Sequence, residues 1–241
     1  MVTYDESSIT SLEWHEHIRR RPGMYVGSLG HGNAKDDGLY VLVKEVIDNA
    51  IDEHLMGFGK VIEMRLDNQS FSVRDYGRGI PLGKIVDCVA KMNTGGKYDG
   101  DSFQKSVGLN GVGTKAVNAL SAAFRVQSVR DGETMSAEFS RAQLLDPSKK
   151  KEKTSEPNGT LVEFVPDSEI FGDFTFKQEF IEEQLKYYAY LNTGLTLVLN
   201  GKKFSSKHGL KDLLEENLSA ERIYPIVRLK GDDVEIAFTH V

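Results

Sequence analysis

The sequence predicts an α+β fold, and three observations lead to this class. Residues 38–57 carry apolar side chains at the three- and four-residue spacing of one long amphipathic helix. Alternating apolar and polar residues after this helix, and again in the second half of the chain, predict strands. The order of helix, hairpin, helix and then several strands lacks the regular alternation of a doubly wound sheet.

The first ten residues are polar and lack apolar periodicity, and we expect a loose arm that orders only against a partner or ligand, with Tyr4 as its large anchor. A short helical stretch follows and breaks at Pro22-Gly23. The long helix then begins at Gly38 and ends at Gly57, because glycine readily takes the backbone conformation that ends a helix.

A β-hairpin is predicted after the long helix, with one strand around residues 62–66 and the next around 71–73. Residues 85–92 have helical spacing, and within them we expect Cys88 to be a buried small side chain rather than a ligand or nucleophile. The stretch from Asn93 to Val112 is rich in small polar residues. Long structureless stretches inside a compact domain are often functional lids.

The second half of the chain begins with a predicted helix at 113–122 and two strands joined by the turn Asp131-Gly132. Residues 146–159 are charged, so we expect a mobile hairpin tip rather than a binding element. The remaining predicted elements are a strand at 160–166, a helix near 176–191, a hairpin around Asn200-Gly201, a helix near 208–217 and final strands.

Charge and composition limit the partners. A formal net charge of -6 argues against nucleic-acid binding through overall electrostatics, so any DNA contact must be local or lie elsewhere. The sequence shows no long apolar run and no export signal, so we expect a cytoplasmic protein without membrane association. The final segment stops in the middle of an alternating pattern, and we therefore expect a truncated chain.

Polar residues on the long helix are the first candidates for chemistry. Glu45, Asn49 and Glu53 are each four residues apart and therefore project from one face. A solvated helix face is the alternative interpretation. Apolar residues interleave closely with the three polar ones, which leaves little room for a stripe that only faces solvent.

The segment DYGRGIP is the second candidate. Gly77 and Gly79 allow a sharp turn and the close approach of a flat ligand. The carboxylate of Asp75 only accepts hydrogen bonds when ionised and so suits an exocyclic amine. A turn that Asp75 merely caps is the alternative interpretation.

The third candidate is a glycine run that leads into a helix, with glycines at 108, 111 and 113. Backbone N–H groups at such a helix start bind phosphate, although this signal alone is weak. The Walker A spacing does not occur, because Thr114-Lys115 has the wrong order. A clear strand does not precede the run, so Rossmann binding is also disfavoured.

Four segments in order, EVIDNAIDE, DYGRGIP, GLNGVGTK and NGTLVEF, resemble the N, G1, G2 and G3 boxes of the GHKL superfamily. That superfamily contains type II topoisomerases, Hsp90 chaperones, MutL mismatch-repair proteins and sensor histidine kinases. Together with IRRRPGMYVG and TGGKY, the boxes resemble the ATPase domain of bacterial type IIA topoisomerase B subunits over essentially the whole chain. The resemblance implies a two-layer GHKL (Bergerat) sandwich, whose mixed, largely antiparallel sheet is covered on one face by helices.

The resemblance also implies roles for individual residues. Glu45 would polarise the water that attacks the γ-phosphate of ATP, and Asn49 would coordinate Mg²⁺. Asp75 would bind the adenine amino group with help from the Thr160 hydroxyl. The other implied contacts to ATP are Tyr4, Glu53, Arg78, Gly79, Ile80, Pro81, Lys97, Gly108, Leu109, Asn110, Gly111, Val112, Gly113 and Thr114.

In this family the arm would dimerise two subunits on ATP binding, and Tyr4 would reach the nucleotide of the opposite subunit. The implied organisation is an arm at 1–15, a GHKL domain at 16–222 and, at 223–241, either the start of a truncated second domain or final strands. The implied partners are DNA and the A subunit in an A2B2 enzyme, and aminocoumarin-type inhibitors would bind the ATP site. The γ-phosphate lysine of the family would lie past Val241, so the fragment would bind ATP better than it hydrolyses it.

Departures from the family pattern refine the assignment. Asn93 and Asn110 stand where gyrase B subunits usually have His, and Tyr76 stands at a position that is often acidic. These differences favour topoisomerase IV over gyrase. The strand at 134–137 lacks an arginine that some relatives place at the pocket mouth, which would alter the reach of inhibitors.

Two other functions remain as alternatives. A MutL- or Hsp90-like ATPase clamp would close on protein or DNA without strand passage, and IRRRPGMYVG and TGGKY disfavour it. A histidine-kinase-like phosphotransfer domain would lack the water-activating glutamate, so Glu45 disfavours that alternative.

Overall fold

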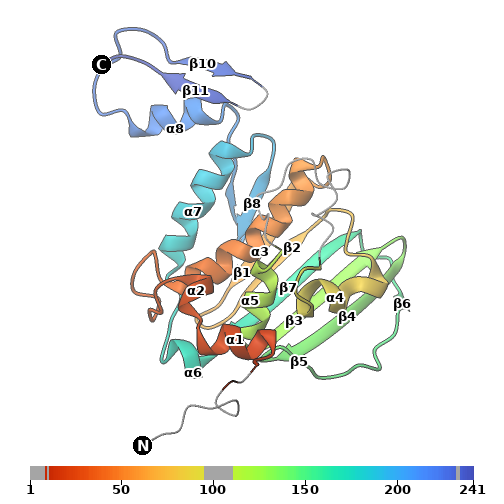
Figure 1. The fold of residues 1–241 in the computed structure, drawn as a ribbon. Coiled ribbons are helices and arrows are strands. Elements are labelled where there is room, and N and C mark those ends of the chain that lie inside the picture. The colour runs from red at the N-terminus through yellow and green to blue at the C-terminus, as the bar shows by residue number, and fades with distance from the viewer. Residues whose placement is uncertain (1–8, 10, 95–110, 232–233) are drawn as a thin grey trace, which may run out of the picture.

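The structure is a computed structural model that describes residues 9, 11–94, 111–231 and 234–241. Helices cover one face of a large mixed sheet, so the predicted α+β two-layer arrangement is confirmed (Figure 1). The helical elements are α1 (Trp14–Arg20), α2 (Gly23–Val26), α3 (Gly38–Leu55), η2 (Leu82–Lys84), α4 (Ile85–Ala90), α5 (Gly113–Ala119), α6 (Ser168–Phe171), α7 (Gln178–Leu191) and α8 (Leu210–Asn217).

The main sheet has the strand order β5-β4-β3-β7-β2-β1-β8-β9, and β6 also pairs with β4. Its neighbouring strands are antiparallel except for the parallel pair β1 and β8. A separate two-stranded sheet contains β10 and β11. The strands are β1 (Val61–Leu66), β2 (Phe71–Asp75), β3 (Ser121–Arg130), β4 (Glu133–Ser140), β5 (Gln143–Leu144), β6 (Glu152–Lys153), β7 (Gly159–Pro166), β8 (Thr196–Leu199), β9 (Lys202–Phe204), β10 (Val227–Lys230) and β11 (Glu235–Phe238).

Both turns predicted from glycine dipeptides are present. Asp131 and Gly132 join β3 to β4 with φ values of 56° and 79°. Asn200 and Gly201 join β8 to β9 with φ values of 48° and 85°. Positive φ at both central residues is typical of the tight turn that matches the twist of a β-hairpin, and Asn, Asp and Gly tolerate it best.

Four phenylalanines form a row across the central strands. Phe71, Phe164, Phe124 and Phe139 lie in register on β2, β7, β3 and β4, and each is at most 2% exposed. The rings of Phe71 and Phe164 meet edge to face with centroids 6.1 Å apart. Such pairs add about 0.5–1.5 kcal/mol beyond the burial of their area. Because a shift of one residue would turn the row out of the core, it fixes the register of these strands.

Three predictions about local structure were wrong in part. Cys88 is only half-buried, although burial still raises the pKa of its thiol.

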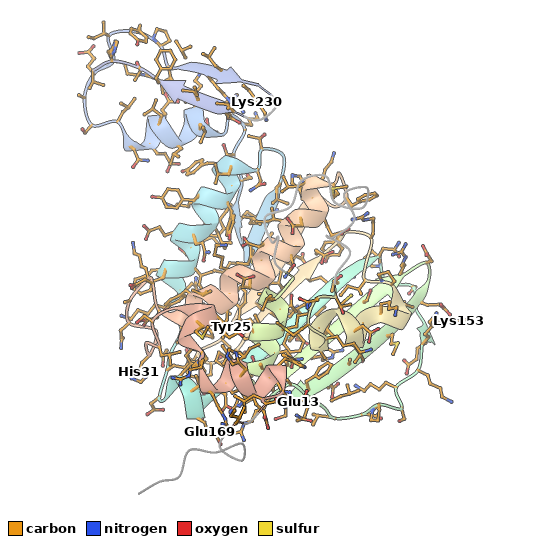
Figure 2. The ribbon with its side chains drawn as sticks, in the orientation of Figure 1. Glu13, Tyr25, His31, Lys153, Glu169 and Lys230 are labelled. Carbon is orange, nitrogen blue, oxygen red and sulfur yellow. The ribbon has the colours of Figure 1, made fainter. Side chains whose placement is uncertain are left out.

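Residues 146–159 do not form the tip of a hairpin, because β4 and β7 are not neighbours in the sheet. The segment instead contains β6, which pairs with the edge of β4. Figure 2 shows Lys153 of this segment at the outer side of the sheet. The charged residues there cover an edge strand.

The helix expected at 113–122 ends early, at Ala119. The Ser121 hydroxyl donates to the carbonyl of Val117 (2.6 Å), and Ser121 already pairs with Pro166 of β7. The backbone after Leu120 is therefore committed to the sheet, which a local helical pattern does not reveal.

A cluster of ion pairs joins α1, the turn after β4 and the start of α6. Asp167 is 1% exposed and accepts hydrogen bonds from Arg19 (2.7 Å) and Arg141 (2.8 Å), while Arg19 also donates to the carbonyl of Ala119. Glu169, labelled in Figure 2, contacts the same arginines. Burial alone would raise the pKa of Asp167, but the hydrogen bonds from Arg141 and Arg19 outweigh it and lower that pKa.

Within the described ranges, no helix is both long and apolar enough to cross a lipid bilayer.

Asp167→Asn should lower the free energy of unfolding by about 2 kcal/mol at pH 7, because two guanidinium groups lose their buried partner. This loss is smaller than the loss expected for a fully buried ion pair, because the Arg141 side chain is 43% exposed. Urea titration measures the loss, which should shrink as the pH falls through the lowered pKa of Asp167. Glu169→Gln, at a 61% exposed side chain, is the control and should cost under about 1 kcal/mol. Equal losses in the two variants would contradict the role of burial.

Candidate functional site

The polar face of α3 lies against the start of α5. Glu45 and Asn49 are half-buried, so this face is not merely solvated. A Cβ atom on Gly113 would lie 1.7 Å from Oε2 of Glu45, so only glycine allows the carboxylate to sit there. The N-terminal end of a helix carries partial positive charge and unpaired N–H groups, which favour a nearby carboxylate.

Asn49 forms the second link between the two helices. Its amide nitrogen donates to the carbonyl of Glu45 (2.7 Å) and to the hydroxyl of Thr114 (2.9 Å). These two bonds fix the orientation of the carboxamide. Predicted site residues from the N box and from the glycine run are therefore brought together, although they lie far apart in the sequence.

Glu53 and Arg78 hold the loop after β2 against α3. The guanidinium donates to both carboxylate oxygens of Glu53 (3.0 and 2.9 Å), and the Arg78 backbone N–H adds a bond of 2.8 Å. Arg78 also stacks over the ring of Phe58 at 4.6 Å. A Cβ on Gly77 would meet Glu53 at 2.7 Å, which explains the glycine at this position. The two charged side chains thus neutralise each other beside the site.

Asp75 lies at the end of β2 and is only 6% exposed. Its Oδ1 atom accepts hydrogen bonds from the backbone N–H groups of Gly77 (2.8 Å) and Thr160 (3.2 Å). Burial raises the pKa of Asp75 to about 6, and the nearby charge of Glu53 adds to this, while the two N–H donors act in the opposite direction. A carboxyl group with such a shifted pKa is typical of a functional site.

The loop after Asp75 passes very close to the sheet. Gly79 has φ of 75°, and a Cβ there would lie 2.4 Å from the carbonyl oxygen of Val129. The hydroxyl of Ser128 donates to the carbonyl of Ile80 (2.8 Å) and holds the loop in place. Ile80 is half-buried, while the next residue, Pro81, is exposed. The loop that follows Asp75 is therefore a wall held against β3.

Sequence reasoning missed two contributors to this wall. Gly159 starts β7 with φ of 141°, and a Cβ there would lie 2.1 Å from the carbonyl oxygen of Asp75. Ser128 reads only as one more alternating residue of a strand, so no sequence signal identifies it. Gly159, in contrast, is the glycine of the NGTLVEF segment. The sequence therefore contained a signal for it, although no role was predicted for this residue.

Five predicted site residues lie outside the described residues. They are Tyr4, Lys97, Gly108, Leu109 and Asn110. Gly111, Val112, Gly113 and Thr114 are described, and all four are partly exposed at the start of α5.

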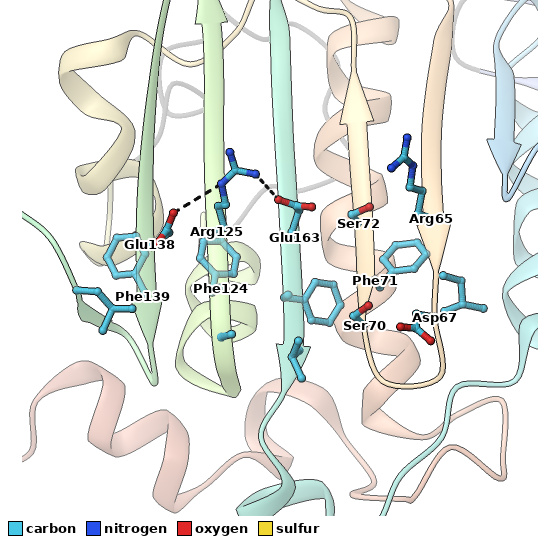
Figure 3. Close-up of a pocket in the computed structure, with 15 residues that line it drawn as sticks. Arg65, Asp67, Ser70, Phe71, Ser72, Phe124, Arg125, Glu138, Phe139 and Glu163 are labelled. Atoms are coloured by element: carbon cyan, nitrogen blue, oxygen red, sulfur yellow. Dashed lines mark hydrogen bonds and ion pairs between the residues drawn. The ribbon is translucent and has the colours of Figure 1, made fainter. Parts of the chain in front are cut away.

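A separate concavity lies on the central strands and shares no lining residue with this site (Figure 3). Its wall includes Arg125, which bonds to Glu163 (2.5 Å) and lies 3.8 Å from Glu138. The charges in this concavity are thus paired across neighbouring strands, and the candidate chemistry remains with Glu45 and Asp75.

Known proteins resemble this chain in both sequence and fold. The chain is 50% identical to the B subunit of DNA topoisomerase 4 from Borreliella burgdorferi, over 98% of its own length and 39% of that protein. It is 35% identical to the B subunit of DNA gyrase from Enterococcus faecalis, over 97% of the chain and 38% of that protein. The chain thus spans about two-fifths of the length of these relatives.

The fold matches the crystal structure of the 43K ATPase domain of Thermus thermophilus gyrase B, which was solved in complex with an aminocoumarin. The TM-score is 0.75 at 31% identity, over 92% of this chain and 61% of that one. Residues 34–170, more than half of the chain, match the model of the histidine kinase-, DNA gyrase B- and HSP90-like ATPases. The segment that carries Glu45, Asp75 and Gly113 lies inside this match, and the chain belongs to this ATPase family.

Proposed function

We propose that this chain binds and hydrolyses ATP as the nucleotide-binding part of a type IIA DNA topoisomerase B subunit. The observation that carries the proposal is the spacing of two polar sites along α3. Asp75 lies beside Glu53, and Gly113 lies beside Glu45, eight residues earlier on the same helix. At a rise of about 1.5 Å per residue the two sites are about 12 Å apart along the axis. That reach suits a nucleotide with its base at Asp75 and its phosphates at Glu45.

The surroundings of Asp75 fit an adenine base. An ionised carboxylate only accepts hydrogen bonds, and the exocyclic amine of adenine donates them. Within the described chain both bonds to Asp75 end on Oδ1, so Oδ2 is the oxygen that we assign to the base. Gly79 lets the loop pack closely against β3, and we propose that Gly79, Ile80 and Pro81 form the wall beside a flat ring. We propose that Thr160 adds its hydroxyl to this contact.

The start of α5 fits the phosphates. Backbone N–H groups at a helix start bind anions, and we assign this role to residues 111–114. Lys97, Gly108, Leu109 and Asn110 remain proposed contacts to the phosphates, and Tyr4 remains the proposed contact from the arm. Glu53 and Arg78 would border the nucleotide as a neutral pair, because each already neutralises the other.

Asn49 suits a magnesium ion through its side-chain oxygen, since its nitrogen already donates to Glu45 and Thr114. Mg²⁺ prefers oxygen ligands and neutralises phosphate charge when bound. Glu45 would accept a hydrogen bond from the attacking water and orient it. Because a carboxylate is a modest base, positioning rather than proton abstraction would supply most of its effect.

For the whole protein we propose ATP-driven passage of one DNA duplex through another, in the cytoplasm and together with an A subunit in an A2B2 assembly. Homodimerisation would use the arm at 1–15, and aminocoumarin-type inhibitors would compete for the ATP site. The higher identity to a topoisomerase 4 subunit than to a gyrase subunit supports topoisomerase IV.

We also propose that residues 16–222 form the ATPase domain and that residues 223–241 begin a second domain. The C-terminal hairpin lies apart from the main sheet in Figure 1. Cross-strand pairs place four large apolar side chains on one face of this hairpin, and each is 36–56% exposed: Val227, Leu229, Ile236 and Phe238. An apolar face of this kind suits coverage by further residues of the same protein.

Glu45→Ala should reduce ATP hydrolysis at least about 100-fold, because the attacking water loses its orienting carboxylate. Binding of a non-hydrolysable ATP analogue should remain. Asp75→Asn should instead weaken binding by about 10- to 100-fold, because a charge-assisted hydrogen bond to the base is lost. Calorimetric titration with Mg²⁺ measures binding, and phosphate release from the full-length subunit measures turnover. Equal loss of binding in both variants would contradict these roles.

Asp75→Asn should also stabilise the protein without nucleotide. With a pKa of about 6 against an ordinary 3.8, ionisation of Asp75 costs the folded state up to about 3 kcal/mol above pH 6. The stability conferred by this raised pKa is complete below pH 3.8 and is lost as the pH rises through 6. The variant should therefore match the wild type near pH 4 and exceed it near pH 8 in thermal unfolding. A gain that does not change with pH would contradict the assigned pKa.

A further inference from the structure

Lys115 is a buried cation to which the proposed ATP site assigns no role. It is the third residue of α5 and is only 2% exposed. Its ammonium group donates to the carbonyl oxygens of Thr94 (2.6 Å) and Gly111 (2.5 Å). The Lys115 side chain thus joins Thr94, which follows α4, to Gly111 of the glycine run.

Asn118 extends this contact by one helical turn. It is fully buried, and its amide nitrogen donates to the carbonyl of Val89 (3.1 Å). Residues three apart lie on the same side of a helix. The inner side of α5 therefore carries two polar side chains that hold backbone carbonyls of α4 and of the segment that follows it.

A buried ammonium group is an inefficient way to stabilise a fold. Removal of a charge from water has a large desolvation cost, and the partners of the ammonium must offset this cost before any net stability remains. A well-packed apolar side chain in the same place is often as stabilising or more so. The contribution of Lys115 is to fix backbone positions, because its hydrogen bonds hold the carbonyl groups of Thr94 and Gly111 in place relative to α5.

We infer that Lys115 is a positioning residue for triphosphate binding. By holding the carbonyl of Gly111, it fixes the peptide units that lead into Val112, Gly113 and Thr114, whose N–H groups we assign to the phosphates. The effect is preorganisation, since backbone donors already in place lose less freedom when an anion binds. This inference rests on the proposed ATP site and adds to it a residue that sets phosphate affinity without contacting adenine.

The test compares two ligands on one set of variants by calorimetric titration: adenosine, which lacks phosphate, and a non-hydrolysable ATP analogue with Mg²⁺. Lys115→Met keeps the length of the side chain and removes its donors. It should bind the ATP analogue about tenfold more weakly and adenosine within about twofold of wild type, as expected for lost hydrogen bonds from a charged donor. Lys115→Arg, which keeps the charge and donors, should recover part of the affinity for the ATP analogue.

Lys203→Met is the matched control, because Lys203 is exposed on β9 at the edge of the sheet. It should change neither affinity. If Lys115→Met does not fold, Lys115→Gln replaces it, since its shorter neutral amide cannot reach both carbonyls and should produce the same selective loss.

An equal loss for both ligands, or no loss for the ATP analogue, overturns the positioning role while the proposed ATP site stands. A wild-type chain that binds neither ligand overturns the proposed ATP site itself. The two failures are therefore distinguishable within one series of titrations.

Discussion

The site depends on the close approach of two helices at a single glycine. Because Gly113 has no side chain, the start of α5 contacts the Glu45 carboxylate in the middle of α3. Asn49 adds a hydrogen bond to Thr114 and so fixes how α5 is rotated against α3. Backbone N–H groups at a helix start can bind anions, so the same contact places a candidate phosphate site beside Glu45. One packing contact therefore brings a candidate base, a candidate metal ligand and a candidate phosphate site together.

A second constraint comes from the sheet. The phenylalanine row fixes the register of β2 against β7, and this register places the start of β7 next to the end of β2. Gly159 then passes within reach of the Asp75 backbone, and Thr160 donates to the Asp75 carboxylate. The core packing that aligns these strands therefore also aligns Asp75 and Thr160, two of the groups that we assign to the base.

Two buried carboxylates lie beside opposite ends of β7, and their pKa values shift in opposite directions. Asp167 is held by Arg19 and Arg141, and its pKa is lowered, so its charge stabilises the fold at neutral pH. Asp75 accepts hydrogen bonds from backbone N–H groups, and burial raises its pKa to about 6, so its charge destabilises the fold. Charged groups that cost stability are expected where a ligand rather than the protein supplies the missing partner.

The sequence alone determined the α+β class, the long helix, both glycine turns and the residue types of the site, because these depend on local spacing and backbone freedom. It also predicted that Glu45, Asn49 and Asp75 carry the chemistry, and these roles stay predictions. Contacts between distant segments were decided only by the tertiary structure. They include the contact of Glu45 with Gly113, the hydrogen bonds of Lys115 to Thr94 and Gly111, and the pairing of β6 with β4. No local pattern encodes these contacts, because each depends on how the helices and strands pack together.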